Sequence, residues 1–197
     1  DRSPSRGLGD VYKRQGHEVA FGQKIYKKIP AFHASEKPIR VVHGKVNIGV
    51  KGEDFDCLFS MLSGGLVSYR YAGKEMIEKI PMPNFWRAPV DNDNGSMAPA
   101  RYAQWKIASM YISHRNGGMF DNVPTKVEEK DNTVTVTYTY FMPTTPASKC
   151  QVAYTVFGDG TIETKLMYDP VEGLPDMPEF GMMFWFNADY DLSLIHI

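Results

Sequence analysis

The sequence has 197 residues, of which 43% are hydrophobic and 13% aromatic, so it can bury the core of one or two domains. The formal net charge is −1, so the chain lacks the excess of basic residues that is typical of nucleic-acid-binding proteins. No apolar run is long enough to span a membrane. Cys57 and Cys150 are too few and too far apart for a disulfide framework or a zinc knuckle. Cys57 alternates with Phe55 and Phe59, so we expect a buried free thiol. Composition leaves the cellular compartment open.

The two ends of the chain are related at the level of DNA. Asp10–Gln15 can be encoded by GAT GTG TAT AAG AGA CAG, and the reverse complement of that string encodes Leu192–Ile197. A transposase adapter joined to both ends of a DNA fragment produces this relationship, whereas the ends of one gene have no reason to show it. Residues 1–15 also lack the apolar core and cleavage site of a signal peptide. We therefore expect residues 1–15 and 192–197 to be translated adapter, and residues 16–191 to be an internal piece of a longer gene.

The next residues have the composition of a strand followed by a linker. Residues 16–26 resemble a single strand, which we expect to end a preceding domain, and residues 27–38, with three lysines and two prolines, favour a linker. From Arg40 onward, apolar and polar residues alternate with the period of half-buried strands. His43 is expected to begin a strand. The predicted strands are Val46–Val50, Phe55–Phe59 and Leu66–Tyr71, and the predicted turns are Ser63–Gly65 and Ala72–Lys74. Together they make a meander of antiparallel hairpins.

The stretch Pro83–Gly95, here called the signature loop, packs two aromatic residues, an arginine between prolines and a run of side-chain oxygens into one segment. The prolines that flank Arg87 fix φ and disfavour helix just upstream. Asp91–Gly95 has the composition of a turn, because Asx side chains bond nearby backbone and glycine tolerates positive φ. The guanidinium of Arg87 can bind a carboxylate with two parallel hydrogen bonds. We therefore expect Arg87 to be substantially buried and paired with Asp91, Asp93 or another carboxylate.

One helix is expected after this loop, and strands follow it. Ser96 is its predicted cap, Pro99 lies in its first turn, and Tyr102 and Trp105 belong to its apolar stripe. The predicted strands downstream are Val134–Tyr140, Gln151–Phe157, Thr161–Met167 and Met182–Phe186, with a turn at Gly158–Gly160. Strands and helices do not alternate as they do in a parallel sheet, so the predicted fold class is all-β.

Two motifs carry a resemblance to a known family. The signature loop, which contains Asn84-Phe85-Trp86-Arg87-Ala88-Pro89-Val90-Asp91-Asn92-Asp93, resembles the NFWRAPxDND hallmark of the small-chain domain of glycoside hydrolase family 2 β-galactosidases. Residues 16–23, with the pattern GHEVAxxQ, resemble the end of the immunoglobulin-like domain that precedes it. The resemblance implies an antiparallel β-supersandwich of the galactose mutarotase type over residues 39–191, incomplete in this chain. Residues 16–26 would then end the immunoglobulin-like domain.

The same resemblance implies that the parent protein hydrolyses terminal, non-reducing β-D-galactosides with retention. The catalytic glutamates and the Mg and Na ligands would lie in other parts of the parent. A tryptophan-bearing loop at the rim of the active site would lie beyond Asp191. A retaining glycosidase needs two carboxylates a few ångströms apart. No pair within residues 16–191 supports that role, and Glu128 and Glu129 favour a solvated turn. The implied function of the segment is structural, in support of the active-site rim, with no cofactor of its own. The implied partners are the barrel and remaining domains of the same polypeptide, in a homo-oligomeric parent.

The candidate site residues each have a structural alternative. They are Trp86, Arg87, Asp91, Asn92 and Asp93. A calcium loop needs oxygens at alternate positions and a distant bidentate glutamate, which this run lacks, so a turn with capping carboxylates is favoured. The indoles of Trp86 and Trp105 can stack on a sugar ring, but a core or interface position is favoured, and Trp185 is expected in the core.

A non-catalytic sugar-binding supersandwich module is the alternative function. An independent mutarotase is disfavoured, because mutarotases use two histidines and a glutamate as general acid and base. His17 and His33 precede the domain, His43 lies in a strand, and only His114 is loosely placed. The strand at residues 16–26 also argues against a stand-alone module.

The apolar run Met182–Phe186 has no charged residue to prevent strand pairing with other chains. Strands such as Val134–Tyr140 and Met182–Phe186 are expected to expose edges or apolar faces that need missing partners. We therefore expect residues 16–191 alone to be insoluble or self-associated, and extension to the natural C-terminus to restore solubility.

Overall fold

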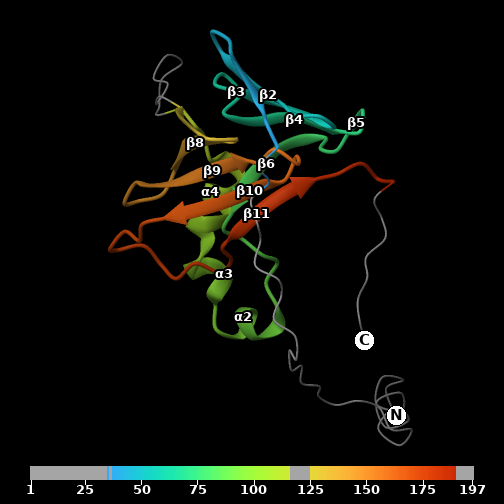
Figure 1. Ribbon diagram of the computed structural model, residues 1–197. Helices are drawn as coiled ribbons and strands as arrows, with labels where there is room; N and C mark the ends of the chain where they lie inside the picture. The colour runs from blue at the N-terminus through green and yellow to red at the C-terminus, as the bar shows by residue number, and fades with distance from the viewer. Residues whose placement is uncertain (1–34, 36, 116–124, 190–197) are drawn as a thin grey trace, which may run out of the picture. The chain divides into compact units, whose positions relative to one another are not determined.

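The computed structural model describes residues 35, 37–115 and 125–189, which form antiparallel sheets and three short helices (Figure 1). The predicted all-β class is therefore confirmed at the level of a mostly β, antiparallel chain. The expected adapter segments 1–15 and 192–197, the strand 16–26 and most of the linker 27–38 lie outside the described residues. No helix in the described part is long and apolar enough to cross a membrane.

The first sheet has five strands that follow one another in chain order. They are β1 (Arg40–His43), β2 (Asn47–Lys51), β3 (Phe55–Ser60), β4 (Gly65–Tyr71) and β5 (Lys74–Glu75). The predicted hairpin meander is confirmed. Ala72 and Gly73 both have positive φ, as a two-residue hairpin turn requires. His43 ends β1 rather than beginning a strand.

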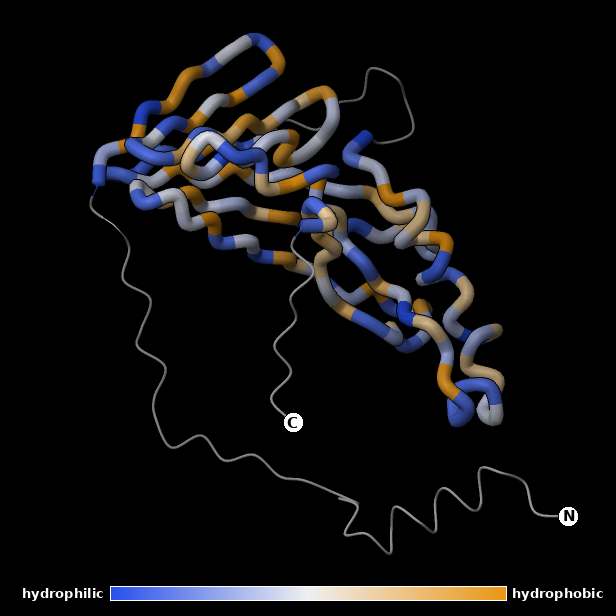
Figure 2. The backbone as a smooth tube through the Cα atoms, turned by 90° about the vertical axis from the view of Figure 1, so that its right-hand side faces the viewer, coloured by the Kyte–Doolittle hydropathy of each residue, from blue (hydrophilic) through white to orange (hydrophobic). Residues whose placement is uncertain are grey.

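The second sheet has four strands in the order β10-β9-β8-β7. They are β7 (Lys126–Lys130), β8 (Thr133–Met142), β9 (Ser148–Val156) and β10 (Ile162–Tyr168). In β8 the threonines alternate with buried residues, as the sequence predicts, and hydrophilic and hydrophobic residues alternate along much of the backbone (Figure 2). Glu128 and Glu129 lie within β7, so the expected turn at these residues is wrong, although both side chains are exposed.

A third sheet pairs two strands that are distant in sequence, β6 (Lys79–Asn84) and β11 (Gly181–Trp185). Pro83 lies opposite Met182 in this ladder. The sequence did not predict β6, because Pro81 and Pro83 remove two ladder donors. Pro81 is fully buried, and the hydroxyl of Tyr154 donates to its carbonyl (3.4 Å), so packing against the second sheet compensates.

Three short helices replace the one that was predicted: α2 (Asp91–Gly95), α3 (Ala98–Arg101) and α4 (Ala103–Tyr111). Asp91–Gly95 forms a single helical turn rather than a non-helical one. Ser96 ends α2, and its hydroxyl donates to the carbonyl of Asp93 (3.1 Å), so it does not cap the following helix. Pro99 lies in the first turn of α3, as expected.

The core lies between the first and second sheets. The rings of Phe59 in β3 and Tyr154 in β9 have centroids 5.7 Å apart, and both side chains are fully buried. From β8, the hydroxyl of Tyr140 donates to the carbonyl of Gly64 and that of Tyr138 to the carbonyl of Gly65. These bonds satisfy phenols that the core would otherwise leave unpaired, and they hold the β3–β4 turn against the second sheet.

Candidate functional site

The signature loop leaves β6 at a fully buried phenylalanine. The ring of Phe85 lies 5.9 Å from Trp105 of α4 and 6.4 Å from Tyr168 of β10, centroid to centroid. Its backbone N–H donates to Ser109 Oγ (2.8 Å), which donates in turn to the carbonyl of Trp105 (2.9 Å). Packing and this hydrogen-bond chain fix the start of the loop to α4. Sequence reasoning missed Ser109, because a serine in a helix does not reveal a bond to a distant segment.

Asn84 and Trp86 shape the next step of the loop. The side-chain amide of Asn84 donates to the carbonyl of Trp86 (2.8 Å), and its oxygen accepts the N–H of Trp86 (3.4 Å). The half-buried indole of Trp86 lines a hollow that it shares with Pro99 and Tyr102. That hollow has a volume of about 10 Å³, enough for about one water molecule but not for a sugar ring. At this position Trp86 serves the packing of the loop.

Arg87 forms a two-point ion pair with Asp93. Its guanidinium nitrogens donate to the two carboxylate oxygens at 2.6 and 3.1 Å, and the carboxylate also accepts the N–H of Val90 (2.9 Å). The hydrogen bond from Arg87 lowers the pKa of Asp93, and the same bond raises the pKa of Arg87. The expected pairing is present, but the expected burial is wrong, since the Arg87 side chain is 40% exposed. The reason is that Asp93 lies on α2, a single surface turn with no buried residue.

The remaining oxygens of the loop face solvent. Asp91 and Asn92 lie in the first turn of α2 and are exposed, where a negative charge is favourable near a helix N-terminus. Within the described ranges, no three His, Cys, Asp or Glu side chains are grouped so that they could hold a metal ion. The contacts that organise the loop are therefore its own hydrogen bonds and its packing.

The other two tryptophans have different environments. Trp105 is buried, and its indole N–H donates to the carbonyl of Pro175 (3.0 Å), so its ring is not available to a sugar. Trp185 was expected in the core but is only partly buried, with the Lys79 ammonium 5.8 Å from its ring centroid. It lies on the thin β6–β11 sheet, which explains its exposure.

The adjacent carboxylates Glu128 and Glu129 each contact a basic side chain at the surface. Glu128 pairs with Lys126 (3.0 Å), and Glu129 Oε1 lies 2.6 Å from His43 Nε2. Hydrogen bonds lower the pKa values of Asp93 and of Glu75, although burial opposes the shift for Glu75, whereas a general acid in a glycosidase needs a raised pKa. Asp93 and Glu75 therefore lack the environment of a catalytic acid.

His114 packs beside the β3–β4 turn. A Cβ atom on Gly64 would lie 2.2 Å from the imidazole Cγ, and Gly64 has a φ of +73°, so glycine is required there for both reasons. Burial lowers the pKa of His114, which favours the neutral ring. His17 and His33 lie outside the described residues.

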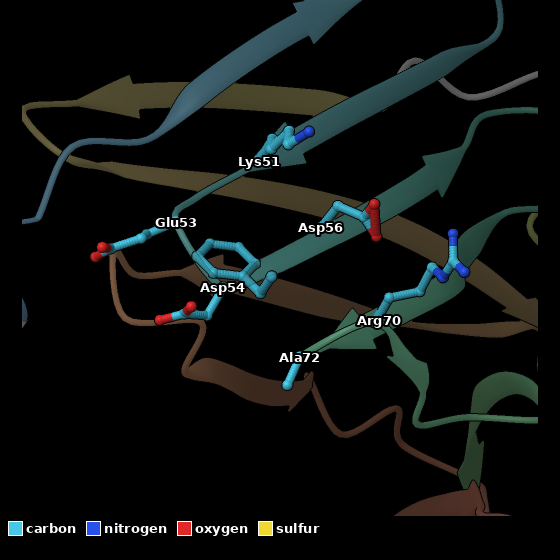
Figure 3. A pocket seen from close by; sticks show the side chains of 8 residues that line it. Lys51, Glu53, Asp54, Asp56, Arg70 and Ala72 are labelled. Carbon is cyan, nitrogen blue, oxygen red and sulfur yellow. The ribbon is translucent and has the colours of Figure 1, made fainter.

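A charged hollow of about 320 Å³ opens on the five-stranded sheet, and sequence reasoning did not identify it. Lys51, Asp56 and Arg70 are direct cross-strand neighbours, and Figure 3 shows them projecting from successive strands. No ion pair joins these three side chains in the described structure, so their charges remain available to a ligand. The alternation of apolar and polar residues along β2, β3 and β4 could have revealed that this face of the sheet is polar, but it could not have revealed the hollow. An adjoining hollow of about 330 Å³ includes Gly49 and Leu58.

Fold and site together define an antiparallel β-domain whose most distinctive loop is held in place by core packing and by its own hydrogen bonds. The family described as β-galactosidase small chain matches residues 51–193. The chain is 39% identical over 183 residues to a β-galactosidase of Clostridium acetobutylicum, covering 92% of this chain and 20% of the relative. It is 41% identical over 186 residues to a β-galactosidase of Halalkalibacterium halodurans, covering 92% of this chain and 18% of the relative.

A third relative is a separate subunit. The chain is 36% identical over 162 residues to the β-galactosidase small subunit of Latilactobacillus sakei, covering 76% of this chain and 51% of the relative. The chain thus spans about a fifth of the first two curated relatives and about half of this subunit. The chain belongs to the β-galactosidase small-chain family, which confirms the family predicted from the signature loop.

Proposed function

We propose that this segment belongs to a family 2 β-galactosidase that hydrolyses terminal, non-reducing β-D-galactosides with retention. The observation that carries the proposal is the family match over residues 51–193, which contains the whole signature loop. Its relatives are either long β-galactosidase chains or a small subunit. The segment would form the first part of a galactose mutarotase-like supersandwich.

Within that enzyme, the proposed role of the segment is structural. Phe85 is anchored in the core, and Arg87 is bound by Asp93, so the loop presents a fixed backbone rather than free catalytic groups. A rigid loop on a β-scaffold can support a neighbouring active-site rim. The Mg and Na ions that the family resemblance implies are proposed to bind to residues in other parts of the parent. The proposed partners are the barrel and the other domains of the parent, together with a galactoside.

A chimera tests this proposal. Residues 40–191 of this chain would replace the matching segment of the Clostridium acetobutylicum relative, and cleavage of a chromogenic β-galactoside would be measured. We expect the chimera to be active and this chain alone to be inactive. A folded but inactive chimera would contradict the proposed role. So would turnover by the isolated chain that disappears when one of its own residues is replaced.

The charged hollow supports a second candidate, a sugar-binding module. Lys51, Asp56 and Arg70 can hydrogen-bond sugar hydroxyls, and a hollow of about 320 Å³ is within the size range of ligand pockets. Calorimetric titration with galactose and lactose distinguishes this role. The sugar-binding role would be favoured if Asp56→Asn abolishes binding and the control Asp131→Asn, at an exposed position, leaves it unchanged.

A further inference from the structure

Gly49 forms a notch on the outward face of the five-stranded sheet, because its neighbours Ile48 and Val50 are buried on the opposite face. Its direct cross-strand neighbours are Val42 of β1 and Leu58 of β3, whose side chains are 51% and 37% exposed. A Cβ atom on Gly49 would meet no heavy atom of a non-adjacent residue within 4 Å, so the notch is open. The two flanking strands are about 9–10 Å apart, which leaves room for one pyranose ring between two apolar side chains.

A row of charged residues crosses the same face beside the notch. It consists of the direct cross-strand neighbours Arg40, Lys51, Asp56 and Arg70, in β1 to β4, and is here called the charged row. The row lies two residues along the strands from Gly49, a distance of about 7 Å. Arg40 and Lys51 carry like charges in directly opposite positions, which is unfavourable in a sheet. Neither forms an ion pair with a described residue, so an anion bound between them would relieve the repulsion.

The other carboxylates near the charged row are engaged elsewhere or point away from it. Glu75 of β5 accepts hydrogen bonds from a hydroxyl and a backbone N–H of β4 (2.5 and 2.8 Å). Glu53 pairs with Lys37 (3.0 Å). Figure 3 shows the side chains of Glu53 and Asp54 pointing away from the row. Within the row itself, Asp56 is the one carboxylate against three cations, so the row has an excess of positive charge.

We propose that this face binds an acidic saccharide, whose ring lies in the notch and whose carboxylate is held by Arg40 and Lys51. A guanidinium binds a carboxylate with two charge-assisted hydrogen bonds, and the ammonium adds a third. Asp56 accepts hydrogen bonds from the ring hydroxyls, and Arg70 donates to the ring oxygens. The inference rests on the second candidate function, the sugar-binding role, and adds that a negative charge is what the site recognises.

Calorimetric titration of the full chain tests the inference. The probes are digalacturonic acid, its dimethyl ester, which has the same rings and no charge, and lactose. We expect the acid to bind at least about tenfold more tightly than the ester or lactose, because neither of these offers a charge-assisted hydrogen bond to the cations. The preference should decrease when sodium chloride is raised from about 0.05 M to about 0.5 M, because salt screens exposed charges.

Charge-removing variants locate the acidic group of the ligand. Arg40→Gln with Lys51→Gln should weaken binding of the acid by about tenfold or more, and should leave any binding of the ester within about twofold. Arg101→Gln with Lys106→Gln is the matched control, because it removes the same charge at exposed positions of α3 and α4. The control should leave the affinity for the acid unchanged.

Filling the notch locates the sugar ring. Gly49→Leu places a side chain in the hollow and should abolish binding of the acid and of the ester alike. Gly95→Leu is the control, because a Cβ atom there also meets no heavy atom within 4 Å, and it lies on α2. Thermal melting checks that each variant is folded. Leu58→Ser, which removes one apolar wall of the notch, gives the answer if Gly49→Leu does not fold.

Equal affinity for the acid and the ester would overturn the inference while leaving the neutral sugar-binding role in place. Acid binding that survives both Arg40→Gln with Lys51→Gln and Gly49→Leu would place the site elsewhere and would also overturn it. If none of the three probes binds, this inference and the sugar-binding role both fail. The galactosidase proposal does not depend on that result, since the chimera tests it separately.

Discussion

Arg87 and Asp93 share two hydrogen bonds, at 2.6 and 3.1 Å, across the six-residue interval that separates them in the signature loop. The Asp93 carboxylate also accepts the N–H of Val90, at the start of α2. One carboxylate therefore joins the proline-flanked segment to the helical turn that follows it. This arrangement gives the arginine and the aspartate a structural reason to occur together in the loop.

Replacement of Arg87 tests this explanation. Arg87→Ala should lower the stability of the chain, because Asp93 loses a two-point partner and α2 loses its connection to the loop. The exposed Arg101→Ala is the control and should have the smaller effect. The measurement is the urea midpoint of both variants. Equal midpoints for Arg87→Ala and the unmodified chain would show that the pair contributes nothing measurable.

The same pair predicts an acid dependence. Because Arg87 lowers the pKa of Asp93 in the folded state, the pair contributes its stability above the unfolded pKa of about 3.9. That contribution is lost as the pH falls through the lower, folded value. The difference in urea midpoint between the unmodified chain and Asp93→Asn should therefore shrink below about pH 4. A difference that stays constant from pH 7 to pH 3 would contradict the assignment.

Ser109 should matter for the anchoring of Phe85. Ser109→Ala removes the acceptor of the Phe85 N–H, and leaving a buried donor unpaired costs about 1–3 kcal/mol. Ser96→Ala, at an exposed position, should change the free energy of unfolding by less than about 0.5 kcal/mol. Denaturant unfolding of both variants gives the comparison. Similar losses for both would indicate that the bond to Ser109 is not formed in solution.

The fully buried ring of Phe85 predicts the largest single effect in the loop. Phe85→Ala should cost about 3–5 kcal/mol, because it leaves a cavity among Trp105, Tyr168 and Phe180. Phe186→Ala, at 53% exposure, is the control and should change stability far less. Calorimetric melting of both variants provides the measurement. A small loss for Phe85→Ala would show that the loop repacks around the gap.

Much of the β-structure could be predicted from local sequence. In β8, four threonines alternate with buried residues, and period two identifies a half-buried strand without reference to any partner. The turn predicted at Ala72–Lys74 was equally clear, because Gly73 tolerates positive φ, whereas the positive φ that Ala72 also adopts is uncommon for a residue with a Cβ atom. Composition also predicted that Arg87 pairs with Asp91, Asp93 or another carboxylate, and the structure identifies Asp93 as the partner.

The remaining features depend on contacts between distant segments. β6 forms despite two prolines because β11, about a hundred residues later, pairs with it. The exposure of Trp185 follows from the thinness of that same sheet, which its apolar neighbours did not reveal. The charged hollow likewise needs the register of Lys51, Asp56 and Arg70 across three strands. Such pairings are set by tertiary packing, which local periodicity does not encode.

Cys57 and Cys150 are both buried and free, which confirms the expectation for Cys57. Burial raises the pKa of each thiol to about 12. Since the thiolate is the reactive form, the folded chain should resist Ellman's reagent at about pH 8, and concentrated denaturant should release both thiols. Fast labelling of the folded chain would contradict the buried positions of these side chains.

The raised thiol pKa values also predict a loss of stability in alkali. An unfolded thiol ionises at about pH 8.5, whereas the folded one keeps its proton up to about pH 12. The unfolded state therefore binds fewer protons across this window, so stability is complete below about pH 8.5 and falls as the pH rises. Replacing both cysteines by alanine removes the thiol contribution to the dependence of stability on pH. The buried hydroxyls of Tyr140 and Tyr154, whose pKa values are also raised, continue to contribute above about pH 10. Urea midpoints measured from pH 7 to pH 11 test this, and identical slopes for the two chains between pH 8.5 and pH 10 would show that the thiols are solvated in the native state.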